Sequence, residues 1–130
     1  MLVGIGMDLV DIERIEAIIN RSEDSFLRLL LSPKELSIYD QLKSSKRKTE
    51  WLAGRFAAKE AASKAFGTGL TGIVTPDCLE ILPDVQGRPE LLFPDALARS
   101  FCAPLRSHLT ITHTKYTAAS IVILETVEPG

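Results

Sequence analysis

The feature that most constrains the fold is the alternation of glycine with bulky apolar residues over residues 2–10. As a strand, this segment has one nearly bare face, formed by Gly4, Gly6 and Asp8. Its other face is apolar throughout and is formed by Val3, Ile5, Met7 and Leu9. Glycine inside a strand lowers its stability and often marks the close approach of a ligand or of another piece of backbone. We therefore predict a closely packed strand that carries one carboxylate on its bare face.

A second constraint is the alanine-rich stretch at residues 49–66, which predicts the longest helix of the chain. Its only internal glycine is Gly54, and the glycine-rich segment 67–69 predicts its end. Glu60 and Lys64 lie one turn apart on this helix, with alanines on both sides. Small flanking side chains are typical of a helix that packs closely against another element.

The other elements follow from hydrophobic periodicity, capping residues and turn residues. Helices are predicted at 12–20, 25–31, 33–42 and 95–101, and strands at 78–82, 90–93, 108–114 and 117–126. Asp11 is the expected N-cap of the first helix, and Ser32 with Glu35 predicts a capping box. Residues 43–49 are expected to form a polar loop. Because helices dominate the first half and strands the second, we predict an α+β fold in a single domain, 1–130.

Composition excludes several classes of protein. A chain of 130 residues that is 45% hydrophobic and 25% charged can bury a core, which argues against disorder and against a disulfide scaffold. The net charge of −2 argues against a protein that binds nucleic acid over its whole surface. The basic segment 43–48 leaves a local nucleic-acid site as a competing hypothesis, although no recognition motif accompanies it.

Two further expectations concern the compartment. Cys78 and Cys102 lie far apart among apolar neighbours, so we expect buried free thiols. The first residues carry neither a basic targeting segment nor an apolar run of bilayer length. We therefore expect a cytoplasmic protein that does not bind membranes.

Asp8 and Glu60 suggest a site for a hard divalent cation. Magnesium takes one or two carboxylates together with waters and phosphate oxygens, and Lys64 could then stabilise a phosphate leaving group. Simpler alternatives remain at this point. Glu60 and Lys64 could form an ordinary surface ion pair, and Asp8 could cap a turn or pair with an arginine.

Three stretches resemble the holo-acyl-carrier-protein synthase family of 4′-phosphopantetheinyl transferases. The first is GIGMDLVDIERIE at 4–16, and the second is WLAGRFAAKEAASKAFGTG at 51–69. The third and weaker one is LTITH at 109–113 with the following strand. They occur in the order of the family and extend over nearly the whole chain. The resemblance implies the transferase fold, in which an N-terminal strand and helices pack on an antiparallel sheet.

The resemblance also implies a reaction. A serine of an apo acyl carrier protein attacks the β-phosphate of coenzyme A and takes up 4′-phosphopantetheine, while adenosine 3′,5′-bisphosphate leaves. Carrier proteins of fatty acid biosynthesis are the expected substrates. The family pattern assigns magnesium to Asp8 and Glu60 and the pyrophosphate to Lys64. The base that accepts the serine proton is either Glu60 or a hydroxide on the magnesium ion.

Further residues match family positions near coenzyme A: Arg55, Phe56, Ser63, Gly67 and His113. His113 corresponds to a histidine that some members place near the phosphate of the nucleotide, and it could equally be an ordinary residue at a strand end. The lysines and arginine at 46–48 could meet the 3′-phosphate or form a solvated loop.

Arg14 and Arg21 are seven residues apart and share one face of the first helix. Acyl carrier proteins are acidic, so these arginines could form the docking surface, with an ordinary solvent-facing helix as the alternative.

The resemblance further implies a homotrimer with active sites between subunits. A carrier-binding module without turnover is the competing reading of the same motifs.

Overall fold

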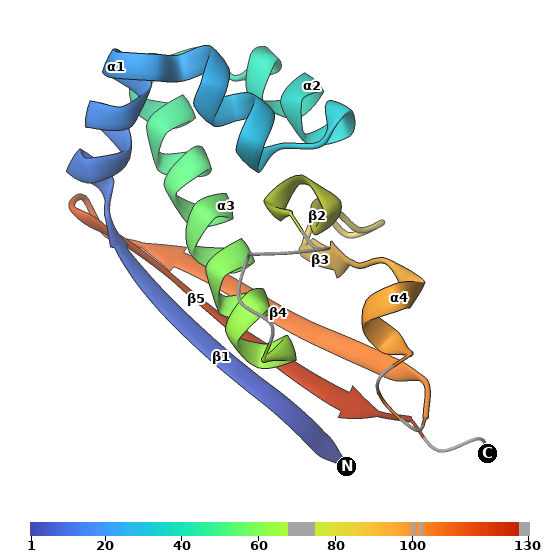
Figure 1. The fold of residues 1–130 in the computed structure, drawn as a ribbon. Coiled ribbons are helices and arrows are strands. Elements are labelled where there is room, and N and C mark those ends of the chain that lie inside the picture. The colour runs from blue at the N-terminus through green and yellow to red at the C-terminus, as the bar shows by residue number, and fades with distance from the viewer. Residues whose placement is uncertain (68–74, 100, 102, 128–130) are drawn as a thin grey trace.

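The computed structural model describes residues 1–67, 75–99, 101 and 103–127. In chain order, its elements are β1 (Leu2–Asp11), α1 (Ile12–Leu30), α2 (Pro33–Gln41), α3 (Ser45–Phe66), the 3-10 turn η1 (Pro76–Cys78), β2 (Glu80–Pro83), β3 (Pro89–Leu92), α4 (Asp95–Ala98), β4 (Leu105–His113) and β5 (Thr117–Thr126). One antiparallel sheet has the order β1-β5-β4, and β2 and β3 form a separate antiparallel pair. Figure 1 shows α3 running along the three-stranded sheet, with α1 and α2 near the start of α3. The predicted α+β architecture with an antiparallel sheet is confirmed.

The bare face of β1 packs directly on the backbone of α3. A Cβ atom on Gly4 would overlap the carbonyl oxygen of Ala65, and one on Gly6 would overlap the carbonyl oxygen of Ala61. The glycines therefore let the strand approach the helix more closely than any other residue allows. The sequence predicted close packing at this face, and the partner is the alanine-rich helix.

The opposite, apolar face of β1 is exposed over most of its length. Ile5 is 69% exposed, Met7 56% and Leu9 60%. Val3 departs from the pattern because a bulge shifts the register with β5 between Leu2 and Gly4. Val3 is consequently half-buried and packs against the core.

Two adjoining clusters of buried residues form the core. The first joins α1 and α2 to the first half of α3, with Ile15, Tyr39 and Leu52 among its members. The second joins the last half of α3 to the strands, with Ile81 and Leu124 among its members. Helix α3 takes part in both clusters, so its position determines how the helical end and the sheet fit together.

Several predicted boundaries are wrong. Residues 45–49 are helical, because Ser44 accepts a hydrogen bond from the N–H of Arg47 at 3.0 Å and so caps α3. The two helices predicted at 12–20 and 25–31 form one element, α1, interrupted by a kink at Ser22 with φ −158° and ψ 57°. Asp11 occupies the N-cap position, but its side chain makes no capping hydrogen bond.

The second half of the chain also departs from the predictions at a few points. Helix α4 ends at Ala98, three residues earlier than predicted, and β4 begins at Leu105, three residues earlier than predicted. Cys78 is exposed at the end of a 3-10 turn, so its predicted burial is wrong. Cys102 lies outside the described residues.

We predict that Gly6→Ala destabilises the protein by about 1–3 kcal/mol, because the added methyl group would have to displace the α3 backbone. The matched control is Gly54→Ala. Its methyl group would meet only the side-chain Cγ2 of Ile111, at 2.9 Å, and alanine favours the helix. Urea unfolding of both variants measures the difference. Equal midpoints for Gly6→Ala and the wild type would contradict the close-packing argument.

Candidate active site

Three of the predicted site residues meet where β1 crosses α3. The Nζ atom of Lys64 lies 3.1 Å from Oδ1 of Asp8 and donates to the carbonyl oxygen of Met7 at 3.0 Å. Glu60 lies one turn earlier on the same helix. Lys64 therefore pairs with Asp8 across the fold, where the simplest interpretation of the sequence paired it with Glu60. The side chain of Lys64 is 54% exposed and that of Asp8 17%, so the cluster is open to solvent on one side.

Electrostatics couples Glu60 to the same cluster. Burial raises the pKa of Glu60, and the nearby negative charge of Asp8 raises this pKa further. The positive charges of Lys64 and Arg14 oppose that rise. Because the negative charges of these two neighbouring carboxylates are not fully compensated, the binding of an added cation would be favourable here.

Asp8 and Glu60 fit the donor set of a magnesium ion. Within the described residues there is no group of three or more acidic, histidine or cysteine side chains around a common point. Magnesium does not require one, because it commonly binds one or two carboxylates and completes its shell with water and phosphate oxygens. The raised pKa of Glu60 beside Asp8 is the observation that suits a divalent cation here.

Arg14 lies at the margin of this cluster. Its guanidinium carbon stacks 5.6 Å from the centre of the Phe56 ring, which links the first turn of α1 to α3. The structure therefore brings two further predicted residues next to one another. Arg21 is exposed on the same helix, just before the kink at Ser22.

Arg55 lies on a different side of α3. Its guanidinium carbon is 4.6 Å from the centre of the Trp51 ring, and its Nε atom is buried without a hydrogen-bond partner among the described residues. Burial lowers the pKa of Arg55 to about 10, with Arg47 lowering it further and Glu35 opposing. A buried donor without a partner is costly, so this arginine has binding capacity for an anion.

Ser63 and Gly67 lie near the end of α3. Ser63 is 4% exposed, and its carbonyl oxygen accepts the N–H of Gly67 at 3.0 Å. Gly67 has φ +77° and ends the helix in the left-handed conformation, as its position in the sequence predicted. The rest of the predicted turn, 68–69, lies outside the described residues.

His113 is not part of the Asp8 cluster. It lies at the end of β4, with Nδ1 at 3.1 Å from the carbonyl oxygen of Thr114 and 4.0 Å from Oε2 of Glu50. Glu50 belongs to the second turn of α3, whereas Glu60 and Lys64 belong to its last turns. Two separate groups of predicted residues therefore lie along α3.

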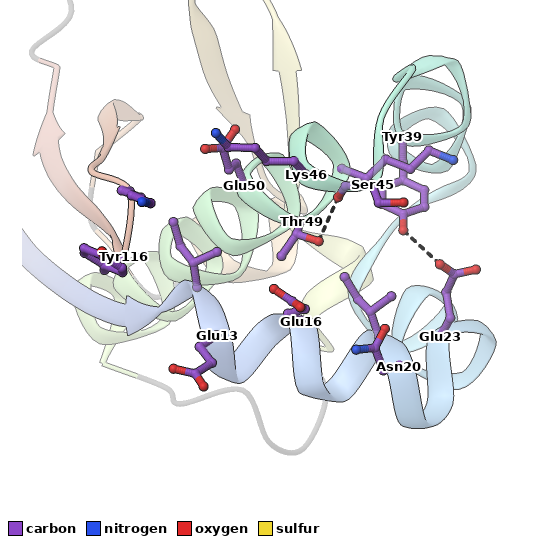
Figure 2. Close-up of a pocket in the computed structure, with 14 residues that line it drawn as sticks. Glu13, Glu16, Asn20, Glu23, Tyr39, Ser45, Lys46, Thr49, Glu50 and Tyr116 are labelled. Carbon is purple, nitrogen blue, oxygen red and sulfur yellow. Dashed lines mark hydrogen bonds between the residues drawn. The ribbon is translucent and has the colours of Figure 1, made fainter.

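A pocket of about 860 Å³ adjoins Glu50 at this end of the molecule. Figure 2 shows Glu13, Glu16 and Glu23 along α1 on one side of it, with Lys46 from α3 among the residues on the other. Within it, Tyr39 donates a hydrogen bond to Glu23 at 3.1 Å, and burial raises the pKa of Tyr39 to about 12. The pocket is lined by none of the ten predicted site residues, although Lys46 and Lys48 from the basic segment take part in it.

Sequence reasoning missed one buried polar centre. The Nζ atom of Lys59 lies 2.7 Å from Oε1 of Glu35, and both side chains are fully buried. The capping box of Ser32 and Glu35 was predicted and is present, but its link to Lys59 was not predicted. The available signal was a single lysine on the alanine-rich face of a helix.

The sequence and the fold both match a known family of proteins. The family model described as 4′-phosphopantetheinyl transferase superfamily matches residues 4–120. That match extends over most of the chain and includes both halves of the Asp8–Glu60–Lys64 cluster. The chain belongs to the 4′-phosphopantetheinyl transferase superfamily.

Close relatives of this transferase share one name. The holo-[acyl-carrier-protein] synthase of Solidesulfovibrio magneticus is 43% identical over 127 residues, which cover 96% of this chain and 99% of the relative. A crystal structure of a holo-(acyl-carrier-protein) synthase from Bacillus anthracis, in complex with CoA (3′,5′-ADP), is 38% identical with a TM-score of 0.82 and covers 98% of this chain and 99% of its own. The synthase of Neisseria meningitidis is 32% identical with a TM-score of 0.85, over 97% and 100% of the two chains. The predicted family is therefore confirmed.

None of the helices in the described ranges has the length and apolar character needed to cross a bilayer.

We predict that Asp8→Asn lowers the pKa of Glu60 in the transferase, because it removes one of the charges that raise it. Since the pKa of Glu60 is raised in the folded protein, this group stabilises the fold at pH below the ordinary glutamate pKa. That contribution is lost as the pH rises through the raised value. Carboxyl-carbon NMR titration of wild type and variant, without added metal, measures the shift. An unchanged Glu60 titration in Asp8→Asn would contradict the coupling of the two carboxylates.

Proposed function

We propose that this transferase is a holo-acyl-carrier-protein synthase that uses coenzyme A, magnesium and an apo acyl carrier protein. The observation that carries the proposal is the meeting of Asp8, Glu60 and Lys64, from segments more than fifty residues apart, within the matched family region. Two carboxylates and one ammonium group suit the transfer of a phosphate-containing group from a pyrophosphate.

Magnesium would be held by the carboxylates of Asp8 and Glu60 and would offset the negative charge of the pyrophosphate. Lys64 contributes a second positive charge on the same face. Its side chain is half exposed, so the ammonium group can reach a phosphate oxygen without leaving the core. Together these groups reduce the repulsion that an incoming oxygen nucleophile meets.

The proposed chemistry is a displacement at the β-phosphorus of coenzyme A. The serine oxygen of the carrier forms a bond to this phosphorus, and the bond from phosphorus to the bridging oxygen breaks. The electron pair leaves with adenosine 3′,5′-bisphosphate, where Lys64 stabilises the new charge. Glu60 accepts the serine proton, a role that suits a carboxylate with a raised pKa.

The nucleotide portion of coenzyme A is assigned to basic groups from the first half of α3 and the end of β4. Arg55 offers a buried donor that has no partner among the described residues, His113 lies 4.0 Å from Glu50, and Lys46 and Glu50 both line the pocket. Phosphate groups bind well to charged donors of this kind. Phe56, Ser63 and Gly67 are assigned to the pantetheine and pyrophosphate portion because they lie along α3 toward Lys64.

The carrier protein is assigned to the exposed arginines of α1. Arg14 lies between Phe56 and the charge of Glu60, so a carrier bound there would bring its serine toward the cluster. Arg21 extends the positive face along α1 before the kink. An acidic carrier would be attracted by both charges, with a dependence on salt.

The proposed assembly is a homotrimer formed through the outer face of the three-stranded sheet. Ile5, Met7 and Leu9 are exposed on β1, and Ile121 beside Met7 is 38% exposed on β5. A contiguous apolar face of this kind is unusual on a monomer and typical of an interface. Closed symmetry allows three copies to cover it equally.

A cytoplasmic location and a role in fatty acid biosynthesis complete the proposal. Cys78 is an exposed free thiol, which suits a reducing compartment. A single domain over residues 1–130 is also part of the proposal.

We expect wild-type protein with coenzyme A, magnesium and an apo acyl carrier protein to add one phosphopantetheine mass to the carrier, and a chelator to prevent this. Asp8→Asn and Glu60→Gln should each lower the rate by roughly 10²–10⁴-fold, because each removes a charge from the reacting centre. Intact-mass measurement of the carrier checks both. Glu90→Gln, at an exposed residue of β3, is the matched control and should retain the wild-type rate.

Near-normal turnover of either cluster variant at saturating magnesium would contradict the assigned roles. Binding of coenzyme A with no mass change for any carrier would favour a binding module over an enzyme.

We expect Met7→Glu to convert trimers into monomers, because it places a charge in the centre of the apolar sheet face. The control is Val85→Glu, a similar change at an apolar residue that is fully exposed in the β2–β3 turn. Sedimentation equilibrium at several concentrations measures the mass. A wild-type protein that sediments as a monomer at every concentration would rule out the proposed assembly.

A further inference from the structure

Glu35 and Lys59 are buried charges that the proposed chemistry does not use. Among the described residues, no other charged residue is buried over its whole side chain, and both of these are 0% exposed. Lys59 donates from Nζ to Oε1 of Glu35 at 2.7 Å and also to the carbonyl oxygen of Leu30. Glu35 accepts the N–H groups of Ser32 and Ile81, each at 3.0 Å. The pair therefore connects α3 with the end of α1, the start of α2 and the strand β2.

A buried ion pair is a poor means of stabilising a fold compared with apolar residues of the same size. The cost of removing both charges from water offsets most of their mutual attraction. Such a pair fixes the relative orientation of the elements that it joins, because charge-assisted hydrogen bonds are strong over a narrow range of distances and angles. Lys59 makes two of the four hydrogen bonds, and the other two hold Glu35, so together they join α3 to α1, α2 and β2 and define one position of Lys59 closely.

Within the described residues, the contact of α3 with β1 has directional bonds only from Lys64, whose side chain is open to solvent. The last turns of α3 lie on β1 through Ala61 and Ala65, which face Gly4 and Gly6. Alanine against glycine sets a short distance between helix and strand, but it offers few protruding side chains that interlock. Apart from the solvent-exposed hydrogen bonds of Lys64, this contact therefore resists separation of helix and strand more than rotation of α3 about its own axis.

Rotation of α3 matters for the candidate active site. Lys59 directly precedes Glu60 and lies five residues before Lys64, so one rigid stretch of helix carries all three side chains. A rotation of α3 about its axis that displaced Lys59 would rotate Glu60 and Lys64 relative to Asp8 by a similar angle.

We propose that the Glu35–Lys59 pair is a positioning device that fixes the rotation of α3 and so directs Glu60 and Lys64 toward Asp8. The proposal rests on the proposed function for what these three residues do. Neither Glu35 nor Lys59 touches the reacting atoms. A displacement of about 1 Å at a reacting centre can cost as much as a hundredfold in rate, so a positioning role is measurable.

The test compares Glu35→Gln and Lys59→Met with Leu97→Ala, which removes buried volume on α4. All are studied well below their melting temperatures, and rates are expressed per folded molecule. We expect kcat to fall at least about tenfold in the two pair variants, with the KM for the carrier changed less than about twofold. Leu97→Ala should melt earlier than wild type and keep its kcat.

Two measurements make the test independent of turnover. The first is Mn²⁺ binding by electron paramagnetic resonance with coenzyme A present, which we expect to weaken about tenfold in both pair variants and to stay unchanged in Leu97→Ala. The second is a crystal structure of Glu35→Gln, in which we expect Lys64 Nζ to have moved away from Asp8 Oδ1.

Wild-type kcat and Mn²⁺ binding per folded molecule in Glu35→Gln, with α3 unmoved, would show that the pair only stabilises the fold. Glu35→Gln decides the outcome if Lys59→Met does not fold. A wild-type protein that transfers nothing would contradict the proposed function, and the crystal structure of Glu35→Gln would still decide whether the pair positions α3.

Discussion

The close contact between β1 and α3 is the constraint on which the rest of the structure depends. The carbonyl oxygens of Ala61 and Ala65 occupy the space where side chains of Gly4 and Gly6 would otherwise lie. That proximity brings Asp8 within 3.1 Å of Lys64, from segments that are more than fifty residues apart. With a larger residue in place of either glycine, strand and helix would separate, and the carboxylate and the ammonium group would separate with them.

Helix α3 has two kinds of contact, and each determines a different part of its position. Toward β1 it presents small side chains, which favour proximity. Toward α1 and α2 it presents Lys59, whose hydrogen bonds to Leu30 and Glu35 favour one orientation, and Glu35 in turn binds β2 through the N–H of Ile81. Apolar packing and buried charge thus act on the same helix in complementary ways, the first on its distance from β1 and the second on its rotation.

The sequence predicted features that depend on local chemistry. The bare face of β1, the capping box at Ser32 and the end of α3 at Gly67 each follow from a few adjacent residues, and each is present. The start of α3 was missed because the polar segment 43–49 resembles a loop in composition, while a single hydroxyl group at Ser44 suffices to cap a helix.

Features that depend on tertiary contact were less accessible. Periodicity alone paired Lys64 with Glu60, one turn away, but the fold brings it to Asp8. The residue types suggested a shared cation site for Asp8 and Glu60, and the family resemblance supported it, but their spacing in the sequence did not show that they lie close together. The resemblance likewise grouped His113 with the other coenzyme A residues, although it lies near Glu50 at the far end of α3. The Glu35–Lys59 pair joins residues separated by 24 positions, and nothing in either local sequence indicates the other.

The register of β1 has a consequence for how this chain can change in evolution. Asp8 pairs with Ser120 on β5, and residues on either side of it alternate between the α3 face and the outer face. Inserting or deleting one residue within this pairing would exchange the two faces, directing Asp8 outward and apolar side chains into the α3 backbone. Substitutions on the outer face leave the cluster in place, whereas changes of length do not. The bulge at Val3 lies before this paired stretch, which marks the one end of the strand where an extra residue is already accommodated.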